Sequence, residues 1–285
     1  MVILIHWNQS RPCLETIEKF RSQPEVVGFV VVDNGSRPEE LEHLRSNLAS
    51  DVALLEVGHN SGFGPGANRG WEHWLADPAG PEWSVVAPHD AHPGVGTITT
   101  MLEAVEGKRV GLMSADVGDG FTPEVQPFLG TIDAPATVAE GFEAADYPHG
   151  TLLMAHRDCL SEIGLFDERY FAYCEEADLG LRAQAAGWEV GLVRGARVYN
   201  QHVNTPAPII DYLKERNTLL LLAEHFGIRQ VAFRSIVAVA QLVMGTIRPS
   251  SRADYWSGRA RLYALRDAAL RRWGPPPDEV FALRR

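Results

Sequence analysis

The apolar run at residues 26–32 (Val-Val-Gly-Phe-Val-Val-Val) is the feature that most constrains the fold of this chain. A strand that is apolar on both faces is typical of a parallel sheet that is covered by helices on both sides. The run ends at Asp33-Asn34-Gly35-Ser36, which is a turn signal, and Pro38 then opens a charged segment. These residues predict one strand–turn–helix unit inside an open sheet.

The same alternation continues along the first two thirds of the chain. Further strands are expected at residues 2–6, 52–57, 83–87, 110–114, 150–156, 189–193 and 197–200. Helices are expected at residues 10–21, 38–48, 65–76, 97–105, 209–226 and 231–247, and an edge strand or hairpin near 121–129. Repeated βα units indicate an α/β protein with a mostly parallel central sheet flanked by helices. Ligands bind such sheets beyond the carboxyl ends of the strands.

Charge and cysteine content limit the partners of the chain. With 26 basic and 37 acidic residues the net charge is −11, which opposes binding to nucleic acid through a general field. Three widely spaced cysteines, at positions 13, 159 and 174, indicate reduced thiols in a cytoplasmic protein. Because residues 2–6 already read as a strand, no targeting sequence is expected. No apolar run reaches the roughly 18 residues that span a bilayer.

Three carboxylates, Glu175, Glu176 and Asp178, stand at the start of a predicted helix, after an aromatic-rich loop. The positive end of a helix dipole favours ionised carboxylates, and the loop can direct one of them into a cleft as a general base. Acidic residues also occur at helix N-termini for stability alone, so both interpretations are open at this point. Arg182 lies four residues after Asp178, which predicts an ion pair and leaves Glu175 and Glu176 for chemistry.

Three polar clusters lie at predicted strand ends or before a helix. Asp33 can accept hydrogen bonds from a nucleobase and a ribose, or it can close an Asx turn. The glycines of residues 60–70 can let the backbone approach a phosphate, or form only a tight loop. Asp90 can hold a divalent cation with a neighbouring histidine, although Mg²⁺ prefers oxygen ligands and only one carboxylate is present.

The order of these motifs resembles the family-2 glycosyltransferases, most closely a rhamnosyltransferase-like branch, over about residues 2–225. The likeness is carried by residues 5–8, 31–36, 60–70, 88–90, 164–171, 175–179 and 212–217, together with Arg182 and His202. The resemblance implies a GT-A fold over residues 1–205. Its nucleotide-sugar half, which is Rossmann-like, would cover about 1–115 and its acceptor half about 116–205, followed by a C-terminal helical extension at 206–285.

The resemblance also implies a reaction. A hexosyl group, such as the deoxyhexose rhamnose, would move with inversion from a dTDP- or UDP-linked sugar to a hydroxyl acceptor in polysaccharide, glycolipid or natural-product biosynthesis. Glu176 occupies the position where the family usually has an aspartate base, and Glu175 is its rival. A divalent cation, Mg²⁺ or Mn²⁺, would bind Asp90 and His202, with His92 as a weaker candidate.

Binding residues follow from the same alignment of motifs and from residue type. The donor nucleotide is expected at Asn8, Arg11, Asp33, Asn34, Ser36, Asn60, Gly62, Gly66, Asn68 and His89. Aromatic rings suit the faces of sugars, and core packing is the alternative for the acceptor candidates Tyr147, His149, Tyr170 and Tyr173.

Two other functions are compatible with parts of this pattern. A non-catalytic glycosyltransferase-like subunit would bind a nucleotide or sugar and position another enzyme. A nucleotidyltransferase would usually carry a phosphate loop rich in glycine and arginine near its N-terminus, which residues 5–11 lack. The apolar helix at 231–247 and the arginine-rich tail predict either peripheral contact of residues 231–285 with the inner face of an anionic membrane, or a helical cap or homodimer interface.

Overall fold

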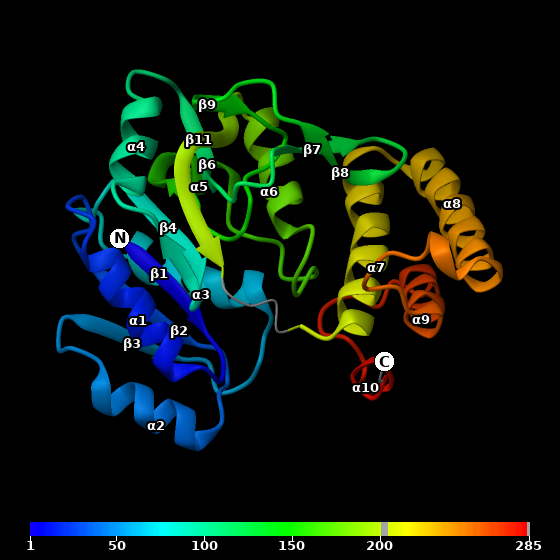
Figure 1. Cartoon of the computed structure of the whole chain (residues 1–285), viewed down its shortest axis with the longest axis horizontal. Coiled ribbons are helices and arrows are strands. Elements are labelled where there is room, and N and C mark those ends of the chain that lie inside the picture. Colours follow the sequence, from blue (N-terminus) through cyan, green and yellow to red (C-terminus); the bar gives the residue numbers. More distant parts are fainter. Residues whose placement is uncertain (201–204, 284–285) are drawn as a thin grey trace.

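The structure is a computed structural model, in which residues 1–200 and 205–283 are described. Figure 1 shows an α/β body at one side of the molecule and a group of C-terminal helices at the other. The strands are β1 (Val2–His6), β2 (Phe29–Asp33), β3 (Val52–Glu56), β4 (Trp83–Pro88), β5 (Ala91–Pro93), β6 (Val110–Asp116), β7 (Phe121–Gln126), β8 (Gly130–Pro135), β9 (Gly141–Ala144), β10 (Leu153–His156) and β11 (Glu189–Asn200). The helices are α1 (Ser10–Arg21), α2 (Pro38–Asn47), α3 (Phe63–Leu75), α4 (Thr97–Ala104), α5 (Arg157–Ile163), α6 (Glu175–Ala185), α7 (Ala207–His225), α8 (Ile228–Ile247), α9 (Gly258–Ala269) and α10 (Asp278–Phe281), with a 3-10 turn, η1 (Pro249–Ser251).

The central sheet has nine strands in the order β3-β2-β1-β4-β10-β6-β11-β5, and β9 pairs with β11. Strands β1 to β4 are parallel to one another, and β6 is parallel to β11. Strand β10 runs antiparallel between β4 and β6. The expectation of a mostly parallel sheet flanked by helices is therefore confirmed.

Every residue of β1, β2 and β6 is buried, because helices cover both faces of the sheet. One core cluster joins the sheet to α1 and α4 through Ile17, Phe20 and Met101. The second cluster joins the opposite face to α3, α5 and α6 through residues that include Trp71 and Leu179. The apolar strand at 26–32 begins three residues later than expected, at Phe29, since residues 26–28 lead into it as a loop.

Strand β11 differs from the sequence expectation of two short strands. It is continuous from Glu189 to Asn200, and its pairing with β6 shifts register between Val193 and Arg197. Gly195 lies in this shifted segment with φ +89°, a left-handed backbone conformation that glycine adopts without steric cost. The apolar pattern is interrupted at this irregularity, which is why the sequence predicts a break. Residues 121–126 and 130–135 form the separate two-stranded hairpin β7–β8.

Helix α7 packs into the body of the protein and does not lie apart from it. Its buried leucines contact the loop and first turn of α6 through Tyr170, Cys174 and Ala177. It also packs against α8 and α9, as Figure 1 shows. The expected division at residues 205/206 stays a prediction.

Helix α8 is long and apolar enough to cross a membrane, with a mean hydropathy of 1.5 over its most apolar window, of which 17% is buried. This corrects the expectation that no segment reaches that length. In the sequence Arg234 interrupts the apolar run, but in the structure its guanidinium points inward and pairs with Glu215 at 2.8 Å. The apolar side chains on the other side of α8 remain exposed.

Candidate active site

The carboxyl ends of β1 and β2 are joined by a network around Asp33. The buried Asp33 carboxylate lies 2.8 Å from His6 Nδ1 and accepts a hydrogen bond from the Ser36 N–H at 3.1 Å. Although burial raises the pKa of Asp33, the hydrogen bonds from His6 and Ser36 hold it below its usual range. The Asn8 side chain accepts a hydrogen bond from the Arg37 N–H at 2.7 Å, and the backbone N–H of Asn8 donates to Ser36 Oγ. Asn8, Asp33 and Ser36 therefore form one rigid corner.

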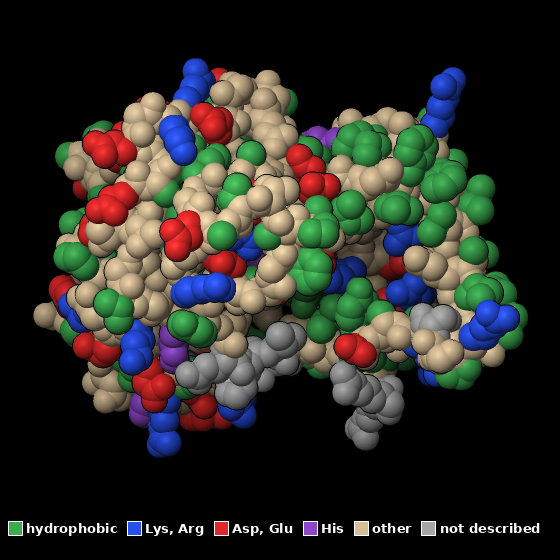
Figure 2. Space-filling view, turned by 45° about the horizontal axis from the view of Figure 1, so that its top comes forward, with side chains coloured by type: hydrophobic (Ala, Val, Ile, Leu, Met, Phe, Trp, Pro, Cys, Tyr) green, Lys and Arg blue, Asp and Glu red, His purple; other side chains and the backbone are tan. Residues whose placement is uncertain are grey.

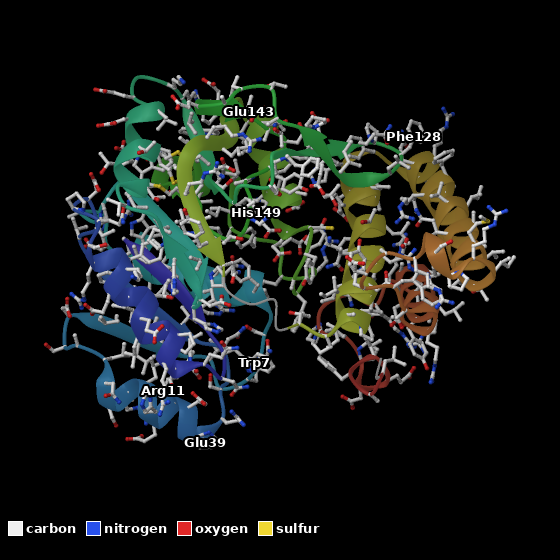
Figure 3. All side chains as sticks on the ribbon, viewed as in Figure 1. Trp7, Arg11, Glu39, Phe128, Glu143 and His149 are labelled. Carbon is white, nitrogen blue, oxygen red and sulfur yellow. The ribbon has the colours of Figure 1, made fainter. Side chains whose placement is uncertain are left out.

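Arg11 lies near this corner at the start of α1, and Figure 3 shows it on the same side of the molecule as Trp7 and Glu39. Its side chain is exposed. Its contact with a donor phosphate remains a prediction.

The glycine-rich loop is tied to other segments by side chains. Asn34 Oδ1 accepts hydrogen bonds from the N–H and hydroxyl of Ser61, and Asn34 Nδ2 donates to the carbonyl of Gly62 at 2.8 Å. Asn60 accepts from the Gly62 N–H. Gly62 has φ +100°, and a Cβ there would lie 2.1 Å from the Phe171 carbonyl oxygen. Glycine is therefore required by this close approach of two loops.

Two residues of this segment are buried in packing, which corrects the expectation that they face the donor. Gly66 packs against Ile5 and Asn34. The Asn68 side chain is 3% exposed, donates to the Phe166 carbonyl at 2.9 Å and accepts from the Phe166 N–H at 3.0 Å. An asparagine that follows glycines suggests a contact with phosphate. In the structure, Asn68 instead fixes α3 to the turn before α6.

The turn after β4 holds the metal candidates. Asp90 is 5% exposed, and none of the hydrogen bonds or ion pairs within residues 1–200 and 205–283 involves its carboxylate. His89 Nδ1 lies 3.0 Å from the Ile5 carbonyl oxygen, while its Nε2 is buried without a partner in the described part of the chain. Burial lowers the pKa of His89 and keeps its ring neutral. His92 lies on β5, paired with β11.

His202 lies outside the described residues. Within the described ranges, His, Cys, Asp and Glu form no group of three or more that could hold a metal ion. A buried carboxylate with no hydrogen-bond or ion-pair partner among the described residues still fits Mg²⁺ or Mn²⁺, because these ions commonly take one or two carboxylates and complete their coordination with substrate phosphates and water.

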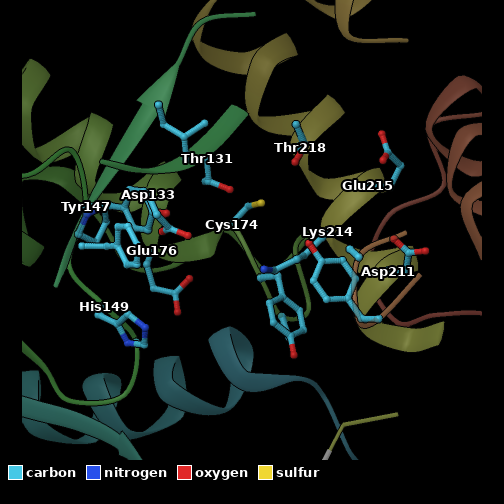
Figure 4. Close-up of a pocket in the computed structure, with 18 of the residues that line it drawn as sticks. Thr131, Asp133, Tyr147, His149, Cys174, Glu176, Asp211, Lys214, Glu215 and Thr218 are labelled. Carbon is cyan, nitrogen blue, oxygen red and sulfur yellow. The ribbon is translucent and has the colours of Figure 1, made fainter. Parts of the chain in front are cut away.

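A cavity of about 1130 Å³ lies between the α/β body and the C-terminal helices. Its wall includes the start of α6, residues 147–151, the β7–β8 hairpin, and the inner sides of α7 and α8. Figure 4 shows Tyr147, His149 and Glu176 on one side of this space and Lys214 across from them. The cavity therefore joins segments that are far apart in the sequence.

Both candidate bases border this cavity, but they differ in exposure. Glu175 is 1% exposed, and its Oε2 is buried without a hydrogen-bond partner among the described residues. Burial raises its pKa well above the usual range, and the neighbouring Glu176 adds to the shift. Glu176 is only partly buried, and burial raises its pKa to about 7, against the opposing effects of a backbone N–H and the charge of Lys214. The geometry favours Glu176 as the carboxylate that meets a substrate.

The backbone before α6 is held in an unusual conformation. Phe171, Tyr173 and Cys174 have φ values of +64°, +68° and +73°, and none of them is a glycine. Such residues cost free energy and persist only where surrounding structure fixes them. Here Asn217 of α7 donates hydrogen bonds from Nδ2, each of 2.8 Å, to the carbonyls of Tyr170, Ala172 and Tyr173. The sequence does not predict this role of Asn217, since a polar residue in a helix gives no local sign of it.

Among the acceptor candidates, Tyr147, His149 and Tyr173 line the cavity. Tyr170 does not, which corrects its assignment: it is 0% exposed and packs with Cys174, Leu220 and Leu221. Lys214, which the sequence analysis also did not assign, reaches the cavity from α7. Its ammonium lies 5.9 Å from the ring centre of Tyr173 and 5.0 Å from that of Tyr255.

The third acidic residue of α6 has a structural role, as expected. Asp178 pairs with Arg182 at 2.8 Å, and His225 contacts its other oxygen at 2.8 Å. Although burial raises the pKa of Asp178, the partners His225 and Arg182 hold it below the usual range. Arg182 also donates to the carbonyls of Ile163 and Leu165. The pair therefore anchors α6 to the loop before it.

Sequence comparison gives relatives but no family model that matches the chain. The chain is 28% identical over 214 residues to N-acetylglucosaminyl-diphospho-decaprenol L-rhamnosyltransferase of Mycobacterium tuberculosis, a match to 63% of this chain and 68% of that protein. It is 26% identical over 190 residues to the low-salt glycan biosynthesis hexosyltransferase Agl10 of Haloferax volcanii, covering 63% of this chain and 61% of that protein.

Solved structures with the same fold are more distant in sequence. GalNAc-T7 with UDP, GalNAc and Mn²⁺ has a TM-score of 0.63 at 11% identity, covering 94% of this chain and 54% of that one. The mannosyltransferase PcManGT of Pyrobaculum calidifontis with GDP-Man and Mn²⁺ has a TM-score of 0.58 at 14% identity, with 95% and 86% covered. S. aureus TarS 1–349 with UDP-GlcNAc has a TM-score of 0.56 at 13% identity, with 99% and 82% covered.

The fold is that of the GT-A glycosyltransferases, and the relatives found by sequence are named glycosyltransferases. The chain is therefore similar in sequence to family-2-like glycosyltransferases and shares the GT-A fold.

Proposed function

We propose that the protein is an inverting hexosyltransferase that uses a nucleotide diphosphate sugar and a hydroxyl acceptor. The observation that carries this proposal is the partly exposed Glu176 carboxylate on the wall of the cavity, with a pKa of about 7. A group with this pKa is ionised often enough near neutral pH to accept a proton and basic enough to take it. The family-2-like sequence supports the same assignment.

In the proposed reaction, Glu176 removes the proton from an acceptor hydroxyl. The acceptor oxygen forms a bond to the anomeric carbon as the bond from that carbon to the diphosphate oxygen breaks. The electron pair of the broken bond leaves with the nucleoside diphosphate, and the configuration is inverted because attack and departure are on opposite faces. Tyr147, His149 and Tyr173 would hold the acceptor, and much of the rate would come from this alignment.

The donor nucleotide would bind at the corner formed by Asn8, Asp33 and Ser36, with Arg11 and His89 as further contacts. Asn34, Asn60 and Gly62 would shape that corner from behind. A divalent cation, held by Asp90 together with donor phosphate oxygens, would neutralise charge on the departing diphosphate. The solved structures of GalNAc-T7 and PcManGT, which share the fold, contain Mn²⁺, and this supports the proposal.

The sequence relative that acts on a diphospho-decaprenol supports a finer proposal for the substrates. The donor would be a dTDP- or UDP-linked deoxyhexose such as rhamnose, and the acceptor a glycan carried on a diphospho-lipid. The enzyme would then work at the cytoplasmic face of a membrane. The alternative role of the C-terminal helices is to form the interface of a homodimer.

The donor and the metal can be tested together. We expect that at least one member of a panel of dTDP-, UDP- and GDP-sugars will be hydrolysed or transferred, measured as release of the nucleoside diphosphate. EDTA should slow this release, Mg²⁺ or Mn²⁺ should restore it, and Asp90→Asn should lower the restored rate. Tight binding of a nucleotide sugar without any release would support the non-catalytic subunit instead. If the release of nucleoside diphosphate were unchanged in EDTA, the assignment of Asp90 as a metal ligand would be wrong.

The position of Glu176 depends on Gly150, which gives a second prediction. A Cβ at Gly150 would lie 2.1 Å from Glu176 Oε1, so the change Gly150→Ala must displace the carboxylate, the flexible end of that side chain. Since a misplacement of about 1 Å can cost about 10²-fold in rate, we expect kcat to fall by about that factor with little change in thermal unfolding. Gly28→Ala, where the Cβ meets only the Met1 side chain at 3.3 Å, is the matched control. Wild-type kcat in Gly150→Ala would contradict the assignment.

A further inference from the structure

The outward side of α8 is apolar along its whole length. Ile236 is 70% exposed and Ile247 is 69% exposed. Most of the exposed residues recur at spacings of three and four, which places them on one side of a helix: Ile228, Phe233, Ile236, Val239, Val243, Met244 and Ile247. Helix α8 contains no acidic residue, and its single inward cation, Arg234, is paired with Glu215. Most of this helix side is therefore uncharged and in contact with solvent.

The tip of the β7–β8 hairpin extends this apolar surface. Phe128 and Leu129 are 41% and 45% exposed, and the Phe128 ring lies 5.3 Å from the ring of Phe233 in an edge-on contact. Figure 3 shows Phe128 beside α8, and Figure 2 shows hydrophobic side chains gathered over this end of the molecule. We call the exposed residues of α8 together with Phe128 and Leu129 the α8 face.

Cations lie at the two ends of the α8 face. Arg229 is exposed in the first turn of α8. Arg252 is exposed after its last turn, where its guanidinium stacks 4.2 Å from the ring centre of Trp256 and its Nε donates to the Gly245 carbonyl. The whole chain carries a charge of −11, so this cationic margin contrasts with the rest of the surface. An apolar helix side flanked by arginines is typical of helices that lie in the interface of an anionic membrane.

The cavity reaches from the candidate base to this same helix. Glu176 and His149 border one part of it, and Val237, Ala240 and Met244 of α8 border another. Lys214 lies between, with its ammonium near two tyrosine rings. A molecule that fills this cavity, with its sugar at Glu176 and a phosphate near Lys214, would therefore also contact α8.

We propose that the α8 face docks the protein on the surface of an anionic membrane, with α8 lying in the interface. The bilayer is the occupant that matches both the uncharged helix side and the arginines at its ends. Docking of this kind places the side of the cavity that α8 borders at the bilayer, where an acceptor with a lipid tail can reach it. The part of this inference that concerns the acceptor rests on the proposed function, whereas membrane docking does not.

The test is flotation of the full chain with phosphatidylcholine vesicles that do or do not contain phosphatidylglycerol. We expect binding to the anionic vesicles, weaker binding to the neutral ones, and a loss of at least about tenfold in vesicle affinity for Ile236→Glu/Val243→Glu, because charged residues at these positions oppose insertion. Val95→Glu, which changes a more exposed apolar residue outside the α8 face, should bind as the wild type does. Far-UV circular dichroism checks that the double variant is folded.

Three outcomes separate the alternatives. Absence of vesicle binding by the wild type would overturn the proposal, and so would equal binding by the double variant. A wild-type dimer in solution that the double variant abolishes, without vesicle binding, would assign the α8 face to a second copy of the chain. Donor hydrolysis in solution is measured alongside: its absence, with vesicle binding intact, would count against the proposed function and leave the docking inference standing.

Discussion

Replacing Glu176 with glutamine is expected to lower kcat by about 10²–10⁴-fold, the usual contribution of a general base, while donor affinity stays close to that of the wild type. The substitution keeps the shape of the side chain but removes its ability to accept a proton. It also leaves Lys214 and the cavity wall in place. The measurement is steady-state release of nucleoside diphosphate, together with titration of a donor nucleotide.

The pH dependence of the wild type provides an independent check. Since the Glu176 pKa is about 7 and only the ionised carboxylate is a base, kcat should rise with pH through about 7 and level off above it. The variant Glu175→Gln tests the rival candidate. Because Glu175 is buried, this variant should keep most of the wild-type activity if Glu176 is the base. Glu124→Gln, on the exposed side of β7, is the control and should have the activity of the wild type. Full activity in Glu176→Gln together with no activity in Glu175→Gln would show that Glu175, and not Glu176, is the base.

Replacing Asn217 with aspartate is expected to have the largest effect on stability. Asn217 Nδ2 donates to three carbonyls of the loop before α6, and the Asn217 side chain is 0% exposed. An aspartate would replace these donors with a buried negative charge that faces the same carbonyls. Losing the partner of a buried network costs about 3–5 kcal/mol in the free energy of unfolding. Chemical denaturation would measure this change.

Activity should fall in the same variant, because the left-handed residues that precede Glu175 and Glu176 lose their support. The smaller change Asn217→Ser keeps a short hydrogen-bonding group and should lie between the wild type and the aspartate variant. Asn47→Asp on the exposed end of α2 is the matched control and should change stability by less than about 1 kcal/mol. An Asn217→Asp protein as stable as that control would show that the loop is held by other contacts.

The sheet could be predicted from the sequence because its strands carry a clear pattern. Residues 2–6, 29–33 and 110–116 are buried throughout and mostly apolar, as strands are when helices cover both faces of a sheet. Strand β11 was predicted as two strands because its register shift at Val193–Arg197 interrupts the pattern without ending the strand. Helix α9 carries arginines that pair with acids of other segments, such as Arg261 with Asp211, and such long-range pairs could not be predicted from the arginine-rich sequence.

The site was predictable where chemistry depends on residue type and not predictable where it depends on tertiary contacts. The Asp178–Arg182 pair follows from a spacing of four residues, and the structure confirms it at 2.8 Å. Whether Glu175 or Glu176 faces the cavity depends on how loops from distant parts of the chain meet the start of α6. For the same reason Tyr170, which carries the aromatic character of a sugar-binding residue, lies in the core.

The hydrogen bonds from Asn217 have a consequence for modular engineering of this protein. The loop that presents the candidate base belongs to one segment of the chain. The side-chain amide that donates hydrogen bonds to this loop belongs to α7, more than forty residues later. A chimera that exchanges residues 166–188 between relatives would therefore need to carry its own α7. A minimal catalytic fragment cut before α7 would lose the support of three left-handed residues at once. Helix α7, the first of the C-terminal helices, is therefore needed to hold the loop that presents the candidate base.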